Sequence, residues 1–230
     1  GHILDKFAKK MSKSLGNVIN PFEMFDKHGA DVLRWYLLTV SPIGTSKLFN
    51  EDELRDVRNK FFDTLINTYK FYVIYSELTG FKDDKANAVP VSERSEIDKW
   101  IISKLNSVKK EYTELMNYYD ITRAARLVSD FTIDEVSNWY VRRNRKRFRN
   151  PENENDKNSA YQTLYTLLED ILKMVAPFSP FISDKLYMSL TDSDTSIHLT
   201  EFTPFDEASI NEPLEKEMEA AQTIVYLVRS

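Results

Sequence analysis

A short polar segment near the start of the chain combines side chains suited to holding a polyphosphate. Residues 9–17 read Lys-Lys-Met-Ser-Lys-Ser-Leu-Gly-Asn, so that ammonium groups and small hydroxyl donors occur together. Lysine binds phosphate as a flexible point charge, and hydroxyl groups donate hydrogen bonds to its oxygens. The glycine-rich backbone cradle of a P-loop is missing, so contact would depend on the side chains. On these residues alone, the alternative is a solvated tail.

A second candidate is a run of six positive side chains within residues 142–149, where no acid occurs. Six cations on two helical turns repel one another unless anions compensate them, and an RNA backbone supplies such anions. Trp139, Tyr140 and Phe148 interleave the run, as in sites that stack RNA bases beside Arg and Lys. The alternatives are pairing with acids of neighbouring helices and, for at least one of Trp139 and Tyr140, a core position. The residues predicted to contact RNA are Trp139, Arg142, Arg143, Arg145, Lys146 and Arg147.

The distribution of charge matters more than its total. A net charge of −5 by itself argues against binding of nucleic acid. However, the acids are concentrated elsewhere, with ten acids and three bases in residues 184–230. The local excess of positive charge at 142–149 therefore keeps RNA binding open.

The composition is that of a folded helical protein. The 230 residues are 42% hydrophobic and 29% charged, enough apolar material for a core and too much for a disordered polymer. The 5 glycines and 8 prolines supply too few turns for an all-β domain of this length. Cysteine is absent, which excludes disulfides and thiolate ligands, and no apolar run approaches the roughly 18 residues of a membrane span. We therefore expect an all-α, cytoplasmic protein without membrane contact.

Apolar periodicity and capping residues predict the helices that position the two candidate segments. Asn20-Pro21 begins a short helix that Gly29 closes, and Asn50 with Glu53 forms a capping-box pattern. Ser179 is the expected cap of a late helix. Short loops favour antiparallel packing into a bundle of four or five long helices behind a small connector. The predicted helices span 21–28, 30–40, 50–78, 97–115, 120–150, 159–175, 180–190 and 212–229, with a polar loop at 80–91 and a brief extended segment at 197–199.

Residues 10–14 match the KMSKS signature identically, and the chain thereby resembles the class I aminoacyl-tRNA synthetases. Leu15-Gly16-Asn17, and later Gly29-Ala30-Asp31 with Arg34, look like the stem-contact region that joins this loop to a helical anticodon-binding bundle in the isoleucine, valine and leucine subfamily. Residues 59–65, 67–69 and 136–142 are similar to isoleucyl-tRNA synthetases in particular, and residues 176–181 add a further family-like turn. The resemblance covers essentially the whole chain.

The resemblance implies an architecture and a set of site residues. It implies an all-α anticodon-binding bundle over 50–195, preceded over 1–49 by the KMSKS loop and a stem-contact connector. Residues 196–230 would begin a further C-terminal region. Lys10 and Lys13 would be the catalytic residues, with Lys13 on the ATP phosphates during adenylate formation and Lys10 supporting it. The implied ATP-binding residues are Lys10, Met11, Ser12, Lys13 and Ser14.

The resemblance implies a parent enzyme that activates isoleucine with ATP and magnesium and transfers it to tRNA(Ile). Neither a HIGH-like motif nor a nucleotide-binding fold occurs in these residues, so we expect a carboxy-terminal fragment that is monomeric, binds tRNA and catalyses nothing alone. ATP and isoleucine would bind through other domains, as would any zinc, because three scattered histidines make no metal site. The alternatives are the same region of a valyl- or leucyl-tRNA synthetase, or a non-enzymatic helical interaction module.

Overall fold

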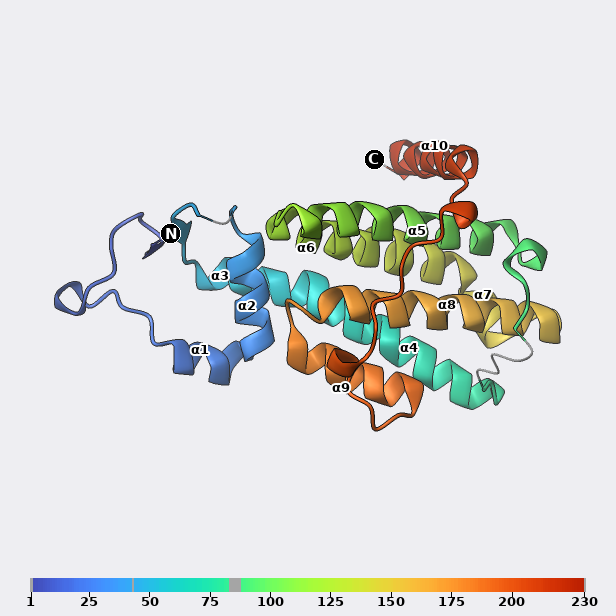
Figure 1. Ribbon diagram of the computed structural model, residues 1–230, viewed down its shortest axis with the longest axis horizontal. Helices are drawn as coiled ribbons and strands as arrows, with labels where there is room; N and C mark the ends of the chain where they lie inside the picture. Colours follow the sequence, from blue (N-terminus) through green and yellow to red (C-terminus); the bar gives the residue numbers. More distant parts are fainter. Residues whose placement is uncertain (1, 43, 83–87, 230) are drawn as a thin grey trace.

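The computed structural model describes residues 2–42, 44–82 and 88–229, and most of them are helical (Figure 1). The first part is a connector. In it, β1 (Ile3–Leu4) pairs in parallel with β2 (Lys47–Leu48), and α1 (Pro21–His28) and α2 (Ala30–Thr39) lie between these strands in the sequence. A single 3₁₀ turn, η1 (Lys13–Leu15), lies in the loop that precedes α1.

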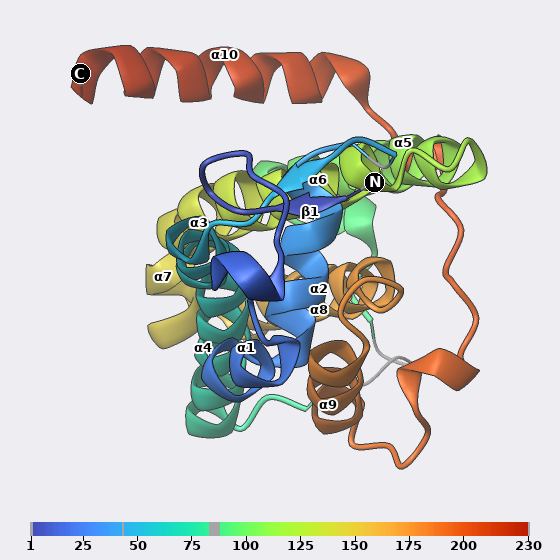
Figure 2. The ribbon, with the colours of Figure 1, turned by 90° about the vertical axis from the view of Figure 1, so that its left-hand side faces the viewer.

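The second part is a helical bundle in which two long rods are each built from three segments. Figure 1 shows the rods and two further long helices side by side, with the chain direction alternating between them, and Figure 2 shows α10 projecting across the top of the bundle. The first rod comprises α3 (Glu51–Val57), the π-helical η2 (Arg58–Phe62) and α4 (Asp63–Thr79). The second comprises α6 (Ile121–Asp130), the π-helical η5 (Phe131–Val141) and α7 (Arg142–Arg149). The remaining helices are α5 (Glu96–Asn117), α8 (Glu154–Val175), α9 (Pro180–Thr191) and α10 (Glu212–Arg229).

One stripe of buried residues on the second rod recurs at a constant spacing of four. An α-helix has 3.6 residues per turn, so a spacing of four drifts by about 40° at each step and would carry the stripe around the rod. The wider π-helical turn of η5 corrects this drift and keeps the stripe on the core. The stripe consists of Ala124, Val128, Thr132, Val136, Tyr140, Asn144 and Phe148, each at most 3% exposed.

Most of the predicted helices are confirmed, and two segments differ from the prediction. The helix expected from Ser159 starts at Glu154, because the side chain of Asn153 caps it by accepting from the backbone of Asp156. The segment 197–199, expected to be extended, is a 3₁₀ turn held by Ser196 and Asp184. Residue 43 of the predicted break after α2, and residues 83–87 of the predicted loop, lie outside the described residues.

The cap of α9 comes from the connector instead of from Ser179. The Asp31 carboxylate, on α2, accepts hydrogen bonds from the backbone N–H groups of Phe181 (3.4 Å) and Ile182 (2.6 Å). The Ser179 hydroxyl makes no cap bond and donates to the Asp31 carbonyl at 3.3 Å. One turn later on α2, Arg34 donates to the carbonyls of residues 177 and 178. These bonds tie the connector to the bundle.

An aromatic cluster packs the same junction. Trp35 on α2 stacks on Phe61 with ring centroids 4.1 Å apart and meets Phe62 and Phe178 edge to face. All four rings are buried, and such pairs are worth roughly 0.5–1.5 kcal/mol each beyond the area they bury. The connector and the bundle therefore share one core.

We expect Asp31→Ala to reduce the free energy of unfolding by about 1–2 kcal/mol, because it removes the cap from two partly buried N–H groups of α9. Chemical denaturation of the chain measures this. Asp26→Ala, at an exposed position of α1, is the matched control and should change stability by less than about 0.5 kcal/mol. Equal stabilities of the two variants would contradict the cap.

Candidate functional site

The KMSKS loop is anchored at its base by Asp5 and Asn17. Asn17 Nδ2 donates to Asp5 Oδ2 at 2.9 Å, and its Oδ1 accepts from the backbone N–H of Ser12, also at 2.9 Å. The other oxygen of Asp5 accepts from the backbone of Phe7 and Lys9. The hydrogen bond from Asn17, followed by that from Lys9, lowers the pKa of the Asp5 carboxyl below its ordinary value. Asp5 therefore holds the loop closed as a carboxylate.

The predicted site residues of this loop lie beyond the anchor. Lys10 and Lys13 are exposed, and neither forms a salt bridge within the described residues. The Ser12 and Ser14 hydroxyls lie 3.1 Å apart, and the Ser12 hydroxyl caps the turn by accepting a hydrogen bond from the backbone N–H of Leu15. Met11 is half-buried and packs against the core. The loop thus presents two ammonium groups to solvent from a fixed base, an arrangement that can bind an anion.

Sequence reasoning missed the role of Asp5. A signal was available, because Asp5 is the one acid among the first 17 residues of the sequence and stands in a lysine-rich segment. Its partner Asn17 could not be identified from the sequence, because the side-chain bonds of Asn17 depend on how the loop folds back.

In the basic run, Arg147 points into the protein and pairs with a buried acid. Its guanidinium donates to both oxygens of Asp98 at 3.0 and 2.8 Å and to Asp156 at 2.6 Å. Asp98 is fully buried and also accepts from the hydroxyls of Tyr140 (2.7 Å) and Ser95 (2.7 Å). Burial alone would lower the pKa of Arg147, but the bonds to Asp98 raise it above its ordinary value. Arg147 was predicted to contact RNA, and the structure instead places it in an internal network.

The orientation of Arg147 fixes the directions of its neighbours. Asn144 and Phe148 are buried on the same side of α7, so the opposite side faces solvent. Arg142, Arg145 and Lys146 are exposed there and form no salt bridge within the described residues. This outward side of α7 is a face of uncompensated positive charge.

Two aromatic contacts flank this face. The Arg143 guanidinium lies 4.2 Å from the ring centroid of Trp139, which is half-buried and donates its Nε1–H to Met218 Sδ on α10 at 3.2 Å. Arg149 Nε donates to the Tyr75 hydroxyl on α4 at 2.8 Å, with its guanidinium 5.3 Å from that ring. Of the predicted aromatic contacts, Trp139 is therefore partly accessible, whereas Tyr140 and Phe148 belong to the core.

The two candidate segments lie apart. Figure 1 shows the KMSKS loop beyond α1 at one end of the long axis and α7 toward the other end. The structure therefore does not bring the predicted ATP-binding and RNA-binding residues into one site.

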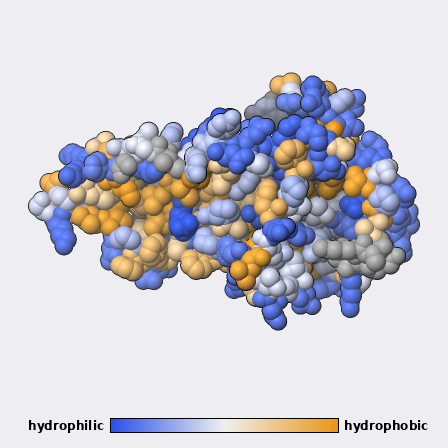
Figure 3. All heavy atoms as spheres, in the orientation of Figure 1, coloured by the Kyte–Doolittle hydropathy of each residue, from blue (hydrophilic) through white to orange (hydrophobic). Residues whose placement is uncertain are grey.

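Hydrophobic side chains gather at the end that carries the loop. Figure 3 shows this patch over the connector, in the same orientation as Figure 1. Within it, Phe7, Leu15, Val18 and Phe22 each expose half or more of their surface. Apolar surface of this kind marks a contact area.

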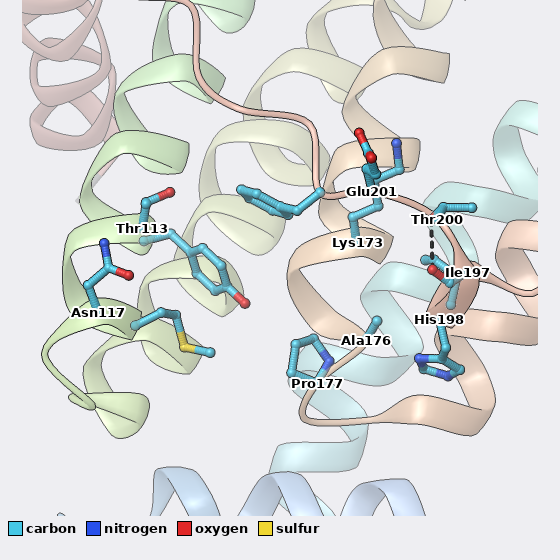
Figure 4. Close-up of a pocket in the computed structure, with 12 residues that line it drawn as sticks. Thr113, Asn117, Lys173, Ala176, Pro177, Ile197, His198, Thr200 and Glu201 are labelled. Carbon is cyan, nitrogen blue, oxygen red and sulfur yellow. Dashed lines mark hydrogen bonds between the residues drawn. The ribbon is translucent and has the colours of Figure 1, made fainter.

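The pocket of Figure 4 lies between the ends of α5 and α8 and the segment 197–202. Three of its polar side chains already have partners: Tyr112 donates to the Met174 carbonyl at 3.0 Å, Lys173 pairs with Glu169, and His198 Nε2 lies 3.1 Å from the Pro180 carbonyl. No group of three or more His, Asp or Glu in the described part of the chain is placed to hold a metal ion. Nor does any described helix have the length and apolar character needed to cross a membrane.

Comparison with known families gives two matches. Residues 98–230 match the model of the anticodon-binding domain of tRNA ligase, and residues 1–49 match that of the class I tRNA synthetases for I, L, M and V. The resemblance seen in the sequence is thereby confirmed.

Curated relatives named isoleucine–tRNA ligase align along the whole chain. That of Bacteroides thetaiotaomicron is 48% identical over 99% of this chain, and that of Clostridium novyi is 44% identical over all of it. The chain covers 20% and 22% of those two proteins, so it spans about a fifth of the length of the curated relatives it matches.

Solved structures agree on the fold. The ternary complex of Agrobacterium radiobacter K84 agnB2 LeuRS with tRNA and LeuAMS superposes with a TM-score of 0.72 at 18% identity, over 92% of this chain and 24% of that one. Mycobacterium tuberculosis methionyl-tRNA synthetase in complex with methionyl-adenylate superposes with a TM-score of 0.67 at 18% identity. This match covers 80% of this chain and 36% of that one.

We expect Arg147→Gln to reduce the free energy of unfolding by about 3–5 kcal/mol, since it leaves the buried Asp98 without its cation. Arg145→Gln, two positions away on the exposed face, is the matched control and should stay within about 0.5 kcal/mol of the parent. Adding Asp98→Asn to Arg147→Gln should recover part of the loss. Urea denaturation of the four proteins decides the matter, and similar midpoints for the two single variants would refute the network.

Proposed function

Because the chain belongs to the anticodon-binding domain family of the class I tRNA ligases, we propose that it is the tRNA-binding region of an isoleucine–tRNA ligase. The whole enzyme would activate isoleucine with ATP and transfer it to tRNA(Ile). The identity of 48% to a relative with that name supports isoleucine over valine or leucine. The outward face of α7, where Arg142, Arg145 and Lys146 lack acid partners in the described chain, is the observation that carries RNA binding.

The contacts on this face divide by chemistry. Arg142, Arg145 and Lys146 would neutralise phosphates and release counterions, which gives affinity without sequence reading. Arg143 is held flat on Trp139, so its guanidinium plane is prepared to stack on an unpaired base of the anticodon loop. Arg147 contributes indirectly, because its bonds to Asp98 fix the orientation of the helix. In this proposal Trp139 belongs to the tRNA interface, because its ring holds the guanidinium of Arg143 in place.

The KMSKS loop would act in adenylate formation. There, a carboxylate oxygen of isoleucine attacks the α-phosphorus of ATP, the bond from that phosphorus to the bridging oxygen breaks, and pyrophosphate leaves. Lys13 would place its ammonium against the negative charge that grows on the leaving phosphates, with Lys10 beside it. Met11, Ser12 and Ser14 would shape the loop or donate hydrogen bonds to ATP. Magnesium would arrive with ATP, and the described residues offer it no site.

The proposal also assigns the domain boundaries of the chain and its contact with the rest of the enzyme. We assign residues 1–49 to the loop and connector, 50–195 to the bundle and 196–230 to the start of a C-terminal region. The exposed apolar patch of the connector would pack against the domain that binds ATP and isoleucine. The enzyme would be a cytoplasmic monomer, and this chain alone would bind tRNA but neither ATP nor zinc.

We expect the triple variant Arg142→Gln, Arg145→Gln and Lys146→Gln to bind tRNA(Ile) more weakly and with less dependence on salt. Each lost phosphate contact lowers the slope of log K against log salt by about 0.9. Filter binding at several salt concentrations measures both quantities. A second triple, Lys110→Gln, Lys185→Gln and Lys216→Gln, removes the same charge from α5, α9 and α10 and is the matched control. If both triples bind alike, the α7 face is not the RNA surface.

In the intact ligase, Lys13→Ala should slow isoleucine-dependent ATP–pyrophosphate exchange by about 10²–10³-fold, the range seen when one charge-stabilising donor is lost. Affinity for tRNA should stay within about twofold, because Lys13 meets phosphate only in the adenylation step. Lys6→Ala, at an exposed position before the loop, is the control. Equal losses in exchange and in tRNA affinity would reassign Lys13 to RNA contact.

A further inference from the structure

The turn between α5 and α6 exposes two consecutive tyrosines. Tyr118 is 85% exposed and Tyr119 is 82% exposed, although both occupy a turn whose backbone is fully ordered by hydrogen bonds. The backbone of Asp120 donates to the Leu115 carbonyl at 2.9 Å, and that of Tyr119 donates to the Met116 carbonyl at 3.1 Å. This pair of bonds is the Schellman motif that ends many helices. The rings are therefore held out into solvent by a rigid turn.

Tyr119 breaks the residue preference of that motif. The position after the C-cap is left-handed, and glycine is usual there because a Cβ is unfavourable. The chain follows the rule at the end of α4, where Gly80 has φ 64° in the same pair of bonds, and uses a small polar residue at the end of α9, where Asp192 has φ 49°. At the end of α5 a bulky aromatic residue adopts φ 59° instead. Folding does not require the ring, so its presence points to a contact outside the described chain.

Both cations and acids lie around the turn. Arg123, one turn along α6, is exposed and forms a salt bridge with Asp120 at 3.6 Å. Arg126 donates to the Thr39 carbonyl, and Lys47 donates to the Ser41 carbonyl at 2.6 Å. Burial and then the charge of Arg126 lower the pKa of Lys47. The acids near the turn include Asp120 and the exposed Glu114, whose carbonyl accepts from the backbone of Tyr118.

The turn also lies on the same rod as the basic face. The second rod begins at Ile121, directly after the turn, and ends at Arg149, which places the tyrosines roughly 40 Å from the end of α7 at 1.5 Å per residue. The outward residues between them include Asp130 and Asp134, so positive charge is concentrated at the two ends. One extended polyanion can reach both ends of such a rod.

We propose that Tyr118 and Tyr119 form a second RNA contact, in which the two rings stack on unpaired or terminal bases while Arg123 faces the adjacent phosphates. Exposed aromatic rings bind bases through their faces without reading sequence, and neighbouring cations hold the backbone. The contact extends the proposed function, because it assumes that the RNA bound by α7 is a tRNA. It predicts a bipartite interface along one rod.

The test combines Tyr118→Ala with Tyr119→Gly in the chain. Glycine suits the left-handed position, so the melting temperature should hold or rise, whereas affinity for tRNA(Ile) should fall by about tenfold. The salt slope should not change, because stacking releases no counterions. Tyr118→Phe with Tyr119→Phe keeps the rings and should bind as the parent. Tyr226→Ala, at a tyrosine that is 73% exposed on α10, is the control for loss of an exposed ring.

Hydroxyl-radical footprinting of the unmodified chain is a second measurement that does not depend on the variants. Oxidation of Tyr118 and Tyr119 should fall when tRNA is added, and that of Tyr226 should not. Parental affinity of the alanine–glycine variant, or unchanged oxidation, would overturn the contact. If the α7 triple variant still weakens binding in that case, the proposed function stands and only this inference fails. Protection of both tyrosines in the intact ligase without tRNA would assign them to contact with another part of the enzyme.

Discussion

The buried carboxylate of Asp98 is the interaction on which the arrangement of the bundle depends most. It lies at the start of α5 and accepts hydrogen bonds from Ser95, Tyr140 and Arg147, so that α5 and the second rod meet at one charge. Arg147 also reaches Asp156 on α8. A buried carboxylate without these donors would be costly, and the same donors in another helix orientation could not reach it. The charge therefore selects one rotation of α7.

That rotation determines which cations are available for function. With Arg147 turned inward, geometry leaves Arg142, Arg145 and Lys146 on the far side. The sequence alone could not divide the run in this way, because all six cations look alike until the position of a distant acid is known. The spacing of four between Tyr140, Asn144 and Phe148 was a usable signal for the inward side. RNA contact by this segment therefore stays a prediction, and the structure turns Arg147 away from the exposed side.

The fold was largely predictable because its helices follow local rules, as at Asn20 and Asn50, whose side chains accept from the first turns of α1 and α3. The errors have one cause, which is that the deciding partner lies far away in the sequence. Asp31 caps α9 from about 150 residues away, so Ser179 looked like the cap when only its own neighbourhood was considered. Asp184 similarly accepts from the backbone of Ile197 and closes a turn in a segment whose apolar residues suggested a strand.

The distribution of rigid and free groups fits an RNA-binding role better than a purely structural one. In the KMSKS loop, in α7 and at the α5–α6 turn, the backbone is fixed by buried or hydrogen-bonded groups while cations or rings remain in solvent. Ordering a flexible segment on binding costs free energy. Where the backbone is already fixed, only the side chain has to be ordered, so the cost is smaller. Tyr119 adds a second argument. Its left-handed backbone costs free energy that a glycine would not cost, and glycine occupies the equivalent position at Gly80. Residues that break a local rule without improving the fold tend to mark functional positions. The interface that we propose therefore includes the turn between α5 and α6 as well as the charged residues of α7.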